Sequence, residues 1–174
     1  GQMLISFRRH NGHWLIHDVA VENKTEKDKQ IPSVRQLAIA LNSAVEFLDA
    51  YAAADKTRLK AVSKPSFYSG SLESSDLNLV SLPTPAASAT THQLRLEAGI
   101  ADFIVTQSHE VMKMNLLRVE AEDSQSAVKY LVSDVSIYDL EEKQEKRLSS
   151  LFTSRAIVDA FAAAIAQRDL DMLM

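Results

Sequence analysis

Residues 14–21 read WLIHDVAV, and residues 130–137 read YLVSDVSI. Both stretches are rich in β-branched and aromatic residues, a composition that favours β-strands. Each has an aspartate at the same place, Asp18 and Asp134, so the two align at an offset of 116 residues (134 − 18). A connector rich in Glu and Lys and then an amphipathic helix follow each of them. This recurring order predicts a repeated α+β module.

A second pair of segments recurs in the same order. The helical residues 34–52 and the break after them match the C-terminal helix at an offset of 114 residues (161 − 47). The matching residues are Phe47, Ala50, Ala52, Asp55 and Leu59 in the first copy and Phe161, Ala164, Ala166, Asp169 and Leu173 in the second. Two blocks at nearly equal offsets indicate an internal duplication, with two residues deleted in the second connector.

The duplication divides the chain into three parts. Residues 1–30 are predicted to be the terminal hairpin of a preceding repeat plus a connector, and residues 31–140 a complete module. Residues 141–174 are predicted to be a solvated connector and the first helix of a following repeat, beginning near Ser154. Because this last helix ends without a stop signal, we expect the chain to be a fragment of a longer repeat protein.

Within the complete module, Ser33 is expected to cap a long helix and Asp55 a short second one. One helical turn is expected within residues 75–80, and four strands follow at residues 94–98, 101–108, 111–119 and 128–138. The connections are too short for crossover helices, so the strands are expected to run antiparallel. The predicted fold class is α+β, with a long helix packed against a curved antiparallel sheet.

The N-terminal hairpin is centred on Asn11-Gly12, a strong signal for a two-residue turn. In this register Phe7 faces Ile16 and Arg9 faces Trp14. Alternation then places one set of apolar residues on a face that we expect to be buried. This set comprises Met3, Ile5, Phe7, Trp14 and Ile16.

The final helix carries a second apolar face, which includes Ile157, Phe161, Ala164, Ile165 and Leu173. Burial of a large apolar side chain is worth about 1.5–3 kcal/mol, so neither face is expected to stay in water. We expect the hairpin and the final helix to pack on each other, within one chain or across a swapped dimer. The substitution Trp14→Ala is therefore expected to lower the melting temperature.

These patterns resemble the nuclear transport factor 2-like superfamily, a cystatin-like α+β cone that also includes ketosteroid isomerases and polyketide cyclases. The resemblance lies in the long helix containing FLDAY (residues 47–51), in PSFY (residues 65–68) and in a terminal strand reading GHWLIHDV (residues 12–19). The second copy of that strand, KYLVSDV (residues 129–135), lacks the Gly and the Trp. The resemblance implies a sheet wrapped around the helix and a conical pocket, used for catalysis in some members and for binding or dimerisation in many.

Composition excludes several functions. The net charge is −4 and no cluster of Lys and Arg stands free of acidic residues, so we expect no nucleic-acid partner. No cysteine is present, which excludes disulfides, thiol catalysis and thiolate metal sites. No apolar run approaches the ~20 residues that cross a bilayer, so no membrane span is expected.

Two histidine groups were considered as sites. His10, His13 and His17 lie near one hairpin turn, but a metal site needs a further convergent ligand, so an exposed polar face is expected. His109 and Glu110 have no nucleophile beside them and are expected to form a surface pair near a turn. We predict neither a metal site nor a cofactor.

Five residues are candidates for binding a ligand in the cone: Tyr51, Tyr68, Asp102, Asn115 and Tyr130. An acid–base site of the ketosteroid-isomerase kind needs a carboxylate and hydrogen-bond donors in an apolar cavity, which Asp102, Asn115 and the tyrosines supply if they face inward. The recurring Asp18 and Asp134 are expected to form hydrogen bonds at the ends of their strands. Met112 and Met114 alternate with a lysine and are expected in the core.

We therefore predict a non-catalytic binding or scaffold module of a larger repeat protein. Its expected partners are neighbouring repeats or a second copy of the chain, with a small molecule or peptide as a further ligand. The alternative is an isomerase, cyclase or dehydratase with an acid–base pocket in the cone. An interior filled with apolar side chains would favour the scaffold, whereas an open cavity of several hundred Å³ would favour the enzyme. An exposed apolar patch on residues 101–119 would favour a sheet face that binds peptides.

Overall fold

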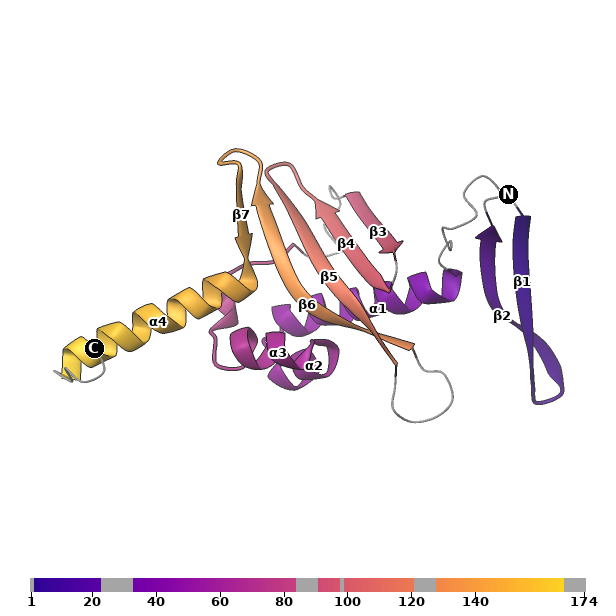
Figure 1. The fold of residues 1–174 in the computed structure, drawn as a ribbon, viewed down its shortest axis with the longest axis horizontal. Helices are drawn as coiled ribbons and strands as arrows, with labels where there is room; N and C mark the ends of the chain where they lie inside the picture. Colours follow the sequence, from indigo (N-terminus) through magenta and orange to yellow (C-terminus); the bar gives the residue numbers. More distant parts are fainter. Residues whose placement is uncertain (1, 23–32, 84–90, 98, 121–127, 168–174) are drawn as a thin grey trace.

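The computed structural model describes residues 2–22, 33–83, 91–97, 99–120 and 128–167. It has the predicted α+β architecture, in which a long helix packs against a five-stranded antiparallel sheet (Figure 1). A separate hairpin lies at one end of the molecule, and a long helix projects from the other. The predicted fold class is thus confirmed.

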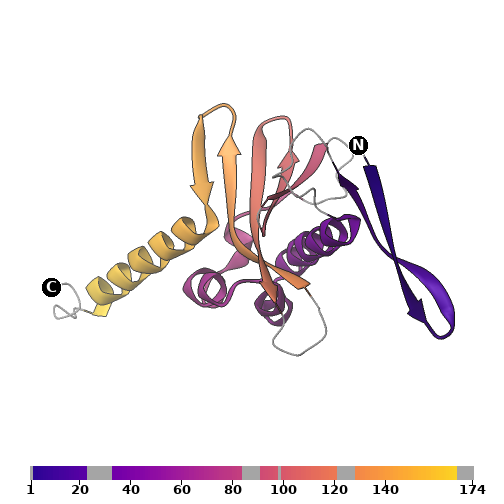
Figure 2. The same cartoon turned by 45° about the vertical axis from the view of Figure 1, so that its right-hand side comes forward.

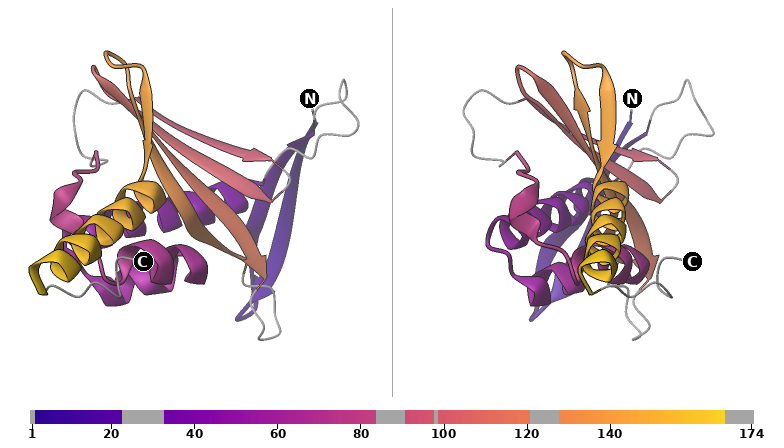
Figure 3. Two further views of the ribbon diagram at one scale, coloured as in Figure 1. Left: turned by 60° about the vertical axis from the view of Figure 1, so that its left-hand side comes forward. Right: turned by 90° about the vertical axis from the view of Figure 1, so that its left-hand side faces the viewer.

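The sheet is a meander whose strands lie side by side in sequence order. Its strands are β3 (Thr91–Glu97), β4 (Ile100–Thr106), β5 (Glu110–Glu120), β6 (Val128–Asp139) and β7 (Gln144–Arg147). All four pairings are antiparallel, as the short connections predicted. Figure 3 shows that the sheet is strongly twisted and that the helices of the module lie on one side of it.

Helix α1 (Val34–Ala52) begins where the sequence predicted. The Ser33 hydroxyl accepts a hydrogen bond from the Gln36 amide (3.2 Å), and the Gln36 side chain accepts one from the Ser33 amide (3.4 Å). This capping box satisfies two amides that the first turn leaves free. The apolar stripe of α1 faces the sheet, with Phe47 fully buried.

The chain breaks after α1 because Ala54 adopts a positive φ of 51°. Asp55 then caps helix α2 (Lys56–Val62) by accepting a hydrogen bond from the Arg58 amide (3.0 Å), as predicted. The short helix α3 (Pro65–Phe67) continues into a π-turn, η1 (Tyr68–Leu72), and the predicted helical turn is a 3₁₀ turn, η2 (Leu77–Leu79).

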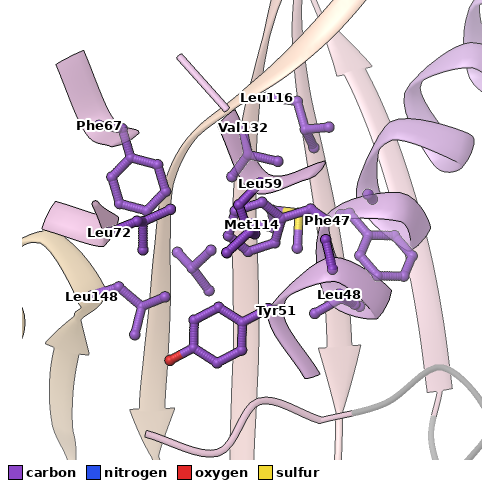
Figure 4. Packing of buried hydrophobic residues seen from close by; sticks show 14 of the residues in the cluster. Phe47, Leu48, Tyr51, Leu59, Phe67, Leu72, Met114, Leu116, Val132 and Leu148 are labelled. Atoms are coloured by element: carbon purple, nitrogen blue, oxygen red, sulfur yellow. The ribbon is translucent and has the colours of Figure 1, made fainter. Parts of the chain in front are cut away.

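The core lies between these helices and the inner face of the sheet (Figure 4). Alternate residues of the central strands point into it, including Phe103 of β4 and Met112 and Met114 of β5. The prediction that the two methionines belong to the core is confirmed. They meet Phe47 from α1 and Leu59 from α2, which are likewise fully buried.

Strands β1 (Gln2–His10) and β2 (His13–Glu22) form the predicted hairpin, as a sheet of their own. Asn11 and Gly12 have φ values of 48° and 84°, so both central residues of the turn take the left-handed conformation that this turn requires. The predicted register holds next to the turn, and a β-bulge then leaves His17 without a partner residue.

The prediction of a buried hairpin face is wrong for this chain by itself. Phe7, Trp14 and Ile16 are 58%, 68% and 64% exposed. Ile5 is exposed as well, whereas the side chain of Met3 lies outside the described residues. No element of the same chain covers this face in the part that the structure describes, because the hairpin stands apart from the five-stranded sheet (Figures 1 and 2).

The second connector and the final helix also differ from the prediction. Residues 144–147 form the edge strand β7, although they were expected to be a solvated connector. Their charged side chains are exposed, a common feature of edge strands that keeps them from pairing with other chains. Helix α4 (Leu148–Gln167) begins about two turns earlier than expected, and its Leu148 and Phe152 are buried in the core.

The hairpin and α4 lie at opposite ends of the molecule (Figures 1 and 2). The expectation that they pack on each other within one chain is therefore wrong. Within α4, Ile157, Phe161 and Ile165 are exposed, Ala164 is buried, and Leu173 lies outside the described residues.

Candidate functional site

Three of the five candidate ligand-binding residues, Tyr51, Tyr68 and Tyr130, lie in the core. The Tyr51 hydroxyl donates a hydrogen bond to the carbonyl of Val80 (3.0 Å), and Figure 4 shows its ring among apolar side chains. Burial, followed by the negative charge of Asp76, raises the pKa of Tyr51 above its ordinary value. Each of these effects favours the neutral phenol, so Tyr51 is suited to hold a loop in place.

The other two tyrosines are also packed rather than open. Burial raises the pKa of Tyr130, although the nearby charge of Arg118 opposes that shift. The Tyr68 ring is buried, and the ammonium of Lys60 lies 5.9 Å from its centre. The sequence prediction correctly placed Tyr51 and Tyr130 inside, but their surroundings are apolar.

Asp102 and Asn115 lie on the outer face of the sheet, which corrects their predicted inward orientation. They face each other across β4 and β5, and their sequence neighbours Ala101 and Met114 are the residues that point into the core. Side chains alternate along a strand, so a shift of one residue in the assumed parity reverses every assignment. The candidate carboxylate and the three tyrosines are therefore on opposite sides of the sheet.

On the outer face Asp102 is the centre of a small polar cluster. Its Oδ1 accepts a hydrogen bond from Nδ2 of the Asn115 side chain (2.7 Å), and its Oδ2 forms an ion pair with Lys113 (3.0 Å). Both carboxylate oxygens thus have partners, and Asp102 is only partly exposed. The arrangement suits contact with a polar group of another molecule better than proton abstraction in an apolar cavity.

The interior supplies few polar groups. Among the described residues the buried polar side chains are Ser63, Ser71 and Ser136, and none of them is a carboxylate. The Ser63 hydroxyl has no hydrogen-bond partner within that part of the chain. The space between α1 and the sheet is instead occupied by large apolar side chains (Figure 4).

The histidines occupy exposed positions. His10 and His13 face each other beside the hairpin turn, whereas His17 accepts a hydrogen bond from the Arg35 guanidinium (3.0 Å). His109 bonds to Glu141 at 2.9 Å, and both side chains are exposed. Within the described ranges, no three His, Asp or Glu residues are grouped so that they could hold a metal ion.

Asp18 and Asp134 occupy similar places inside strands β2 and β6, where each carboxylate reaches the first turn of the next helix. Asp18 Oδ1 accepts hydrogen bonds from the amides of Val19 (2.8 Å) and Arg35 (3.1 Å), and Ser33 bonds to the same carboxylate. Partial burial disfavours the charged form, but the hydrogen bonds from Ser33, Arg35 and Val19 outweigh it and lower the pKa of Asp18.

At the second junction, Asp134 Oδ1 accepts hydrogen bonds from the amides of Val135 (2.8 Å) and Ser149 (3.3 Å). Its Oδ2 accepts one from the Ser149 hydroxyl (2.7 Å). The predicted backbone hydrogen bonds are confirmed, but both aspartates lie inside their strands rather than at the ends. Each carboxylate also ties its strand to the next helix. Ser149 was not among the residues predicted from the sequence, although its offset from Ser33 is the same 116 residues (149 − 33) as that between the aspartates.

Helix α4 presents the largest helical apolar surface of the described chain. Ile157, Val158, Phe161 and Ile165 are each more than half exposed. By length and composition, residues 148–166 meet the requirement for crossing a membrane, although Arg155 and Asp159 form an ion pair (2.9 Å) in the middle of the helix. The absence of a membrane span stays a prediction, as does the absence of a nucleic-acid partner.

Comparison with known proteins gives no relative from which a role can be transferred. No protein-family model, no curated protein and no solved structure matches the chain. Any functional argument therefore depends on the geometry described above.

Proposed function

We propose that the chain is a non-catalytic binding or scaffold module of a larger repeat protein, of the nuclear transport factor 2-like kind. The observation that carries this proposal is the apolar packing between α1 and the sheet. Phe47, Leu59 and Met114 are fully buried between the helices and the sheet, where the resemblance leads us to expect a cone pocket. A filled interior leaves the outer surfaces as the places for contact.

The enzymatic alternative requires a general base in the cone, and its candidate, Asp102, does not lie there. Acid–base chemistry at carbon needs a carboxylate held in an apolar cavity next to hydrogen-bond donors. Asp102 was the candidate, and it lies on the outer face of the sheet with both oxygens engaged by Asn115 and Lys113. The tyrosines that remain inside supply donors without a base.

The outer face of the sheet supports a role in protein contact. The polar cluster of Asp102, Lys113 and Asn115 is flanked on the same two strands by Ile100 and Val119, which are exposed. A mixture of apolar side chains and fixed polar groups is typical of surfaces that bind other proteins. A peptide or a neighbouring module is the ligand class that such a face fits.

Ligand-induced stabilisation tests the filled interior. A molecule that binds only the folded state raises the melting temperature, so a panel of planar apolar compounds is added to the chain during thermal unfolding. We expect no compound to raise the melting temperature of the unaltered chain. The variant Met114→Ala is the matched control, because its cavity should admit benzene and respond to it.

A saturable rise in the melting temperature of the unaltered chain would contradict the proposal and favour the enzyme. Circular dichroism first establishes that Met114→Ala is folded. If that variant does not fold, Leu116→Ala, at another fully buried position of the same core, takes its place.

A further inference from the structure

The hairpin and the strand pair β5–β6 of the main sheet share one register. In β1 and β2, Ile5 pairs with Val19 and Phe7 with Ile16. In β5 and β6, the corresponding pairs are Met114 with Val135 and Leu116 with Val132. The offset is constant along each strand: 109 residues from β1 to β5 (116 − 7) and 116 residues from β2 to β6 (132 − 16).

The bulge falls at the same place in both pairs of strands. It leaves His17 unpaired in β2 and Ser133 unpaired in β6, again 116 residues apart (133 − 17). The aspartate that ties the strand to the following helix comes directly after it in each case. A bulge re-aims all the side chains beyond it, so its shared position gives the two pairs of strands the same pattern of faces.

Corresponding residues differ sharply in burial. Leu116, Tyr130 and Val132 are at most 2% exposed, because α1 and its neighbours cover the inner face of the main sheet. Their counterparts in the hairpin are Phe7, Trp14 and Ile16, which are the exposed residues described above. The hairpin thus presents the same inner face without the helix that covers it in the module.

Helix α4 resembles the helix that would cover this face of the hairpin. It begins 114 residues after α1 (148 − 34), and at this offset Phe161 corresponds to Phe47 and Ile165 to Tyr51. Phe47 and Tyr51 are the buried aromatic residues through which α1 packs on the sheet, whereas Phe161 and Ile165 are exposed. The first turns of α4 are buried in their own module, whereas Ile157, Phe161 and Ile165 farther along are exposed.

We infer that α4 of one chain packs on the hairpin of a second copy of the same chain. The contact reproduces between two chains the packing of α1 on β5 and β6 within one. It is reciprocal, because the second copy offers its own α4 to the hairpin of the first, as in a closed two-fold dimer. The two surfaces of one molecule lie at its opposite ends, so they cannot cover each other (Figures 1 and 2).

A bilayer is a poorer occupant for the α4 surface. Spanning or entering one would bring the Arg155–Asp159 ion pair into a medium where charged groups are costly. At a protein interface the pair can stay at the edge, in water. A bilayer also gives no account of the hairpin, whose register and bulge match a sheet face that a helix covers.

The inference rests on the proposed scaffold function, and its test is independent of the ligand test. Sedimentation velocity measures the association of the full chain over a range of concentrations. Trp14→Glu and Phe161→Glu each place a charge on one of the two surfaces, and Leu79→Glu is the matched control because Leu79 is 55% exposed and lies on neither. We expect the unaltered chain and Leu79→Glu to be dimeric and the other two variants to be monomeric.

Mixing the two monomeric variants provides the decisive observation. A pair made of one Trp14→Glu chain and one Phe161→Glu chain keeps one interface without any substitution, so dimers should reappear at concentrations where neither variant dimerises alone. Circular dichroism verifies that both variants are folded. A monomeric unaltered chain, dimers that survive either charge, or a mixture that stays monomeric would each overturn the inference. Binding of the unaltered chain to phosphatidylglycerol vesicles through Phe161 would assign α4 to a membrane instead.

Discussion

At the scale of single residues, Asp18 in β2 and Asp134 in β6 have the same physical role. Each carboxylate binds the amide of the residue after it and an amide of the first turn of the next helix. Helix amides in the first turn have no partner within the helix, so a carboxylate satisfies them and also interacts favourably with the helix dipole. Asp18 therefore ties β2 to the start of α1, and Asp134 ties β6 to the start of α4.

Acid should weaken the first of these junctions. The pKa of Asp18 is lower in the folded chain than its ordinary value of 3.8, because the hydrogen bonds from Ser33, Arg35 and Val19 outweigh partial burial. A lowered folded-state pKa means that the stabilisation is fully present above pH 3.8 and is lost as the pH falls through the folded-state pKa. We expect the hairpin to lose its fixed attachment to α1 in that range.

Amide chemical shifts of Val19 and Arg35, followed by NMR from pH 6 to pH 2, measure this effect. In Asp18→Asn the carboxyl group is absent, so the shifts of both amides should show no titration below pH 3.8. A titration that persists unchanged in the variant would assign the acid transition to another group.

At the scale of elements, the sequence predicted most of the helices and strands correctly. It did not predict which face of the sheet some side chains lie on. Alternation and β-branched composition were enough to place β3 to β6, because each has one face in the core. Parity within β4 and β5 could not be fixed, since a shift of one residue exchanges the two faces, and this misplaced Asp102 and Asn115. The apolar series Ala101, Phe103 and Val105 did indicate which face of β4 is buried.

Strand β7 and the start of helix α4 were not predicted, for different reasons. Strand β7 consists of Gln, Glu, Lys and Arg, a composition that gives no strand signal and forms a strand only because β6 offers an edge. The start of α4 did carry a signal, the apolar pair Leu148 and Phe152 at helical spacing. The position of the hairpin relative to the module was unpredictable, because it depends on contacts between parts far apart in the chain.

The buried first turns of helix α4 and its exposed later part should contribute differently to the stability of the monomer. Phe152 is 3% exposed in the core, whereas Phe161, two and a half turns later, is 56% exposed. Replacing a buried Phe by Ala typically costs about 3–5 kcal/mol, so Phe152→Ala should be strongly destabilising. Phe161→Ala should change the free energy of unfolding of the monomer by less than about 0.5 kcal/mol.

Urea unfolding at a protein concentration below that of association compares the two variants with the unaltered chain. Equal destabilisation by both would mean that the outer part of α4 is held by its own chain, contrary to its exposed position.

At the scale of the whole molecule, the chain buries one well-packed core and leaves two matched apolar surfaces outside it. The core is formed by α1, α2, the sheet and the first turns of α4. The hairpin is tied to this body by the hydrogen bond from the Arg35 amide to Asp18, and none of its described side chains belongs to the core cluster. Large apolar side chains that stay in water forgo the free energy that burial gives, so such a molecule gains stability by associating.

Association of this kind makes the melting temperature depend on protein concentration. A partner that binds only the folded state stabilises it by mass action, so the melting temperature of the unaltered chain should rise as concentration is increased a hundredfold. Trp14 is the most exposed large residue of the hairpin, and Trp14→Ala removes most of its contact area without adding a charge. The variant should melt at the temperature of the dilute unaltered chain at every concentration. Its matched control, Leu79→Ala, should keep the concentration dependence, because Leu79 is similarly exposed but lies on neither matched surface. Differential scanning calorimetry measures both, and a melting temperature of the unaltered chain that does not move with concentration would mean that the hairpin stays uncovered in solution.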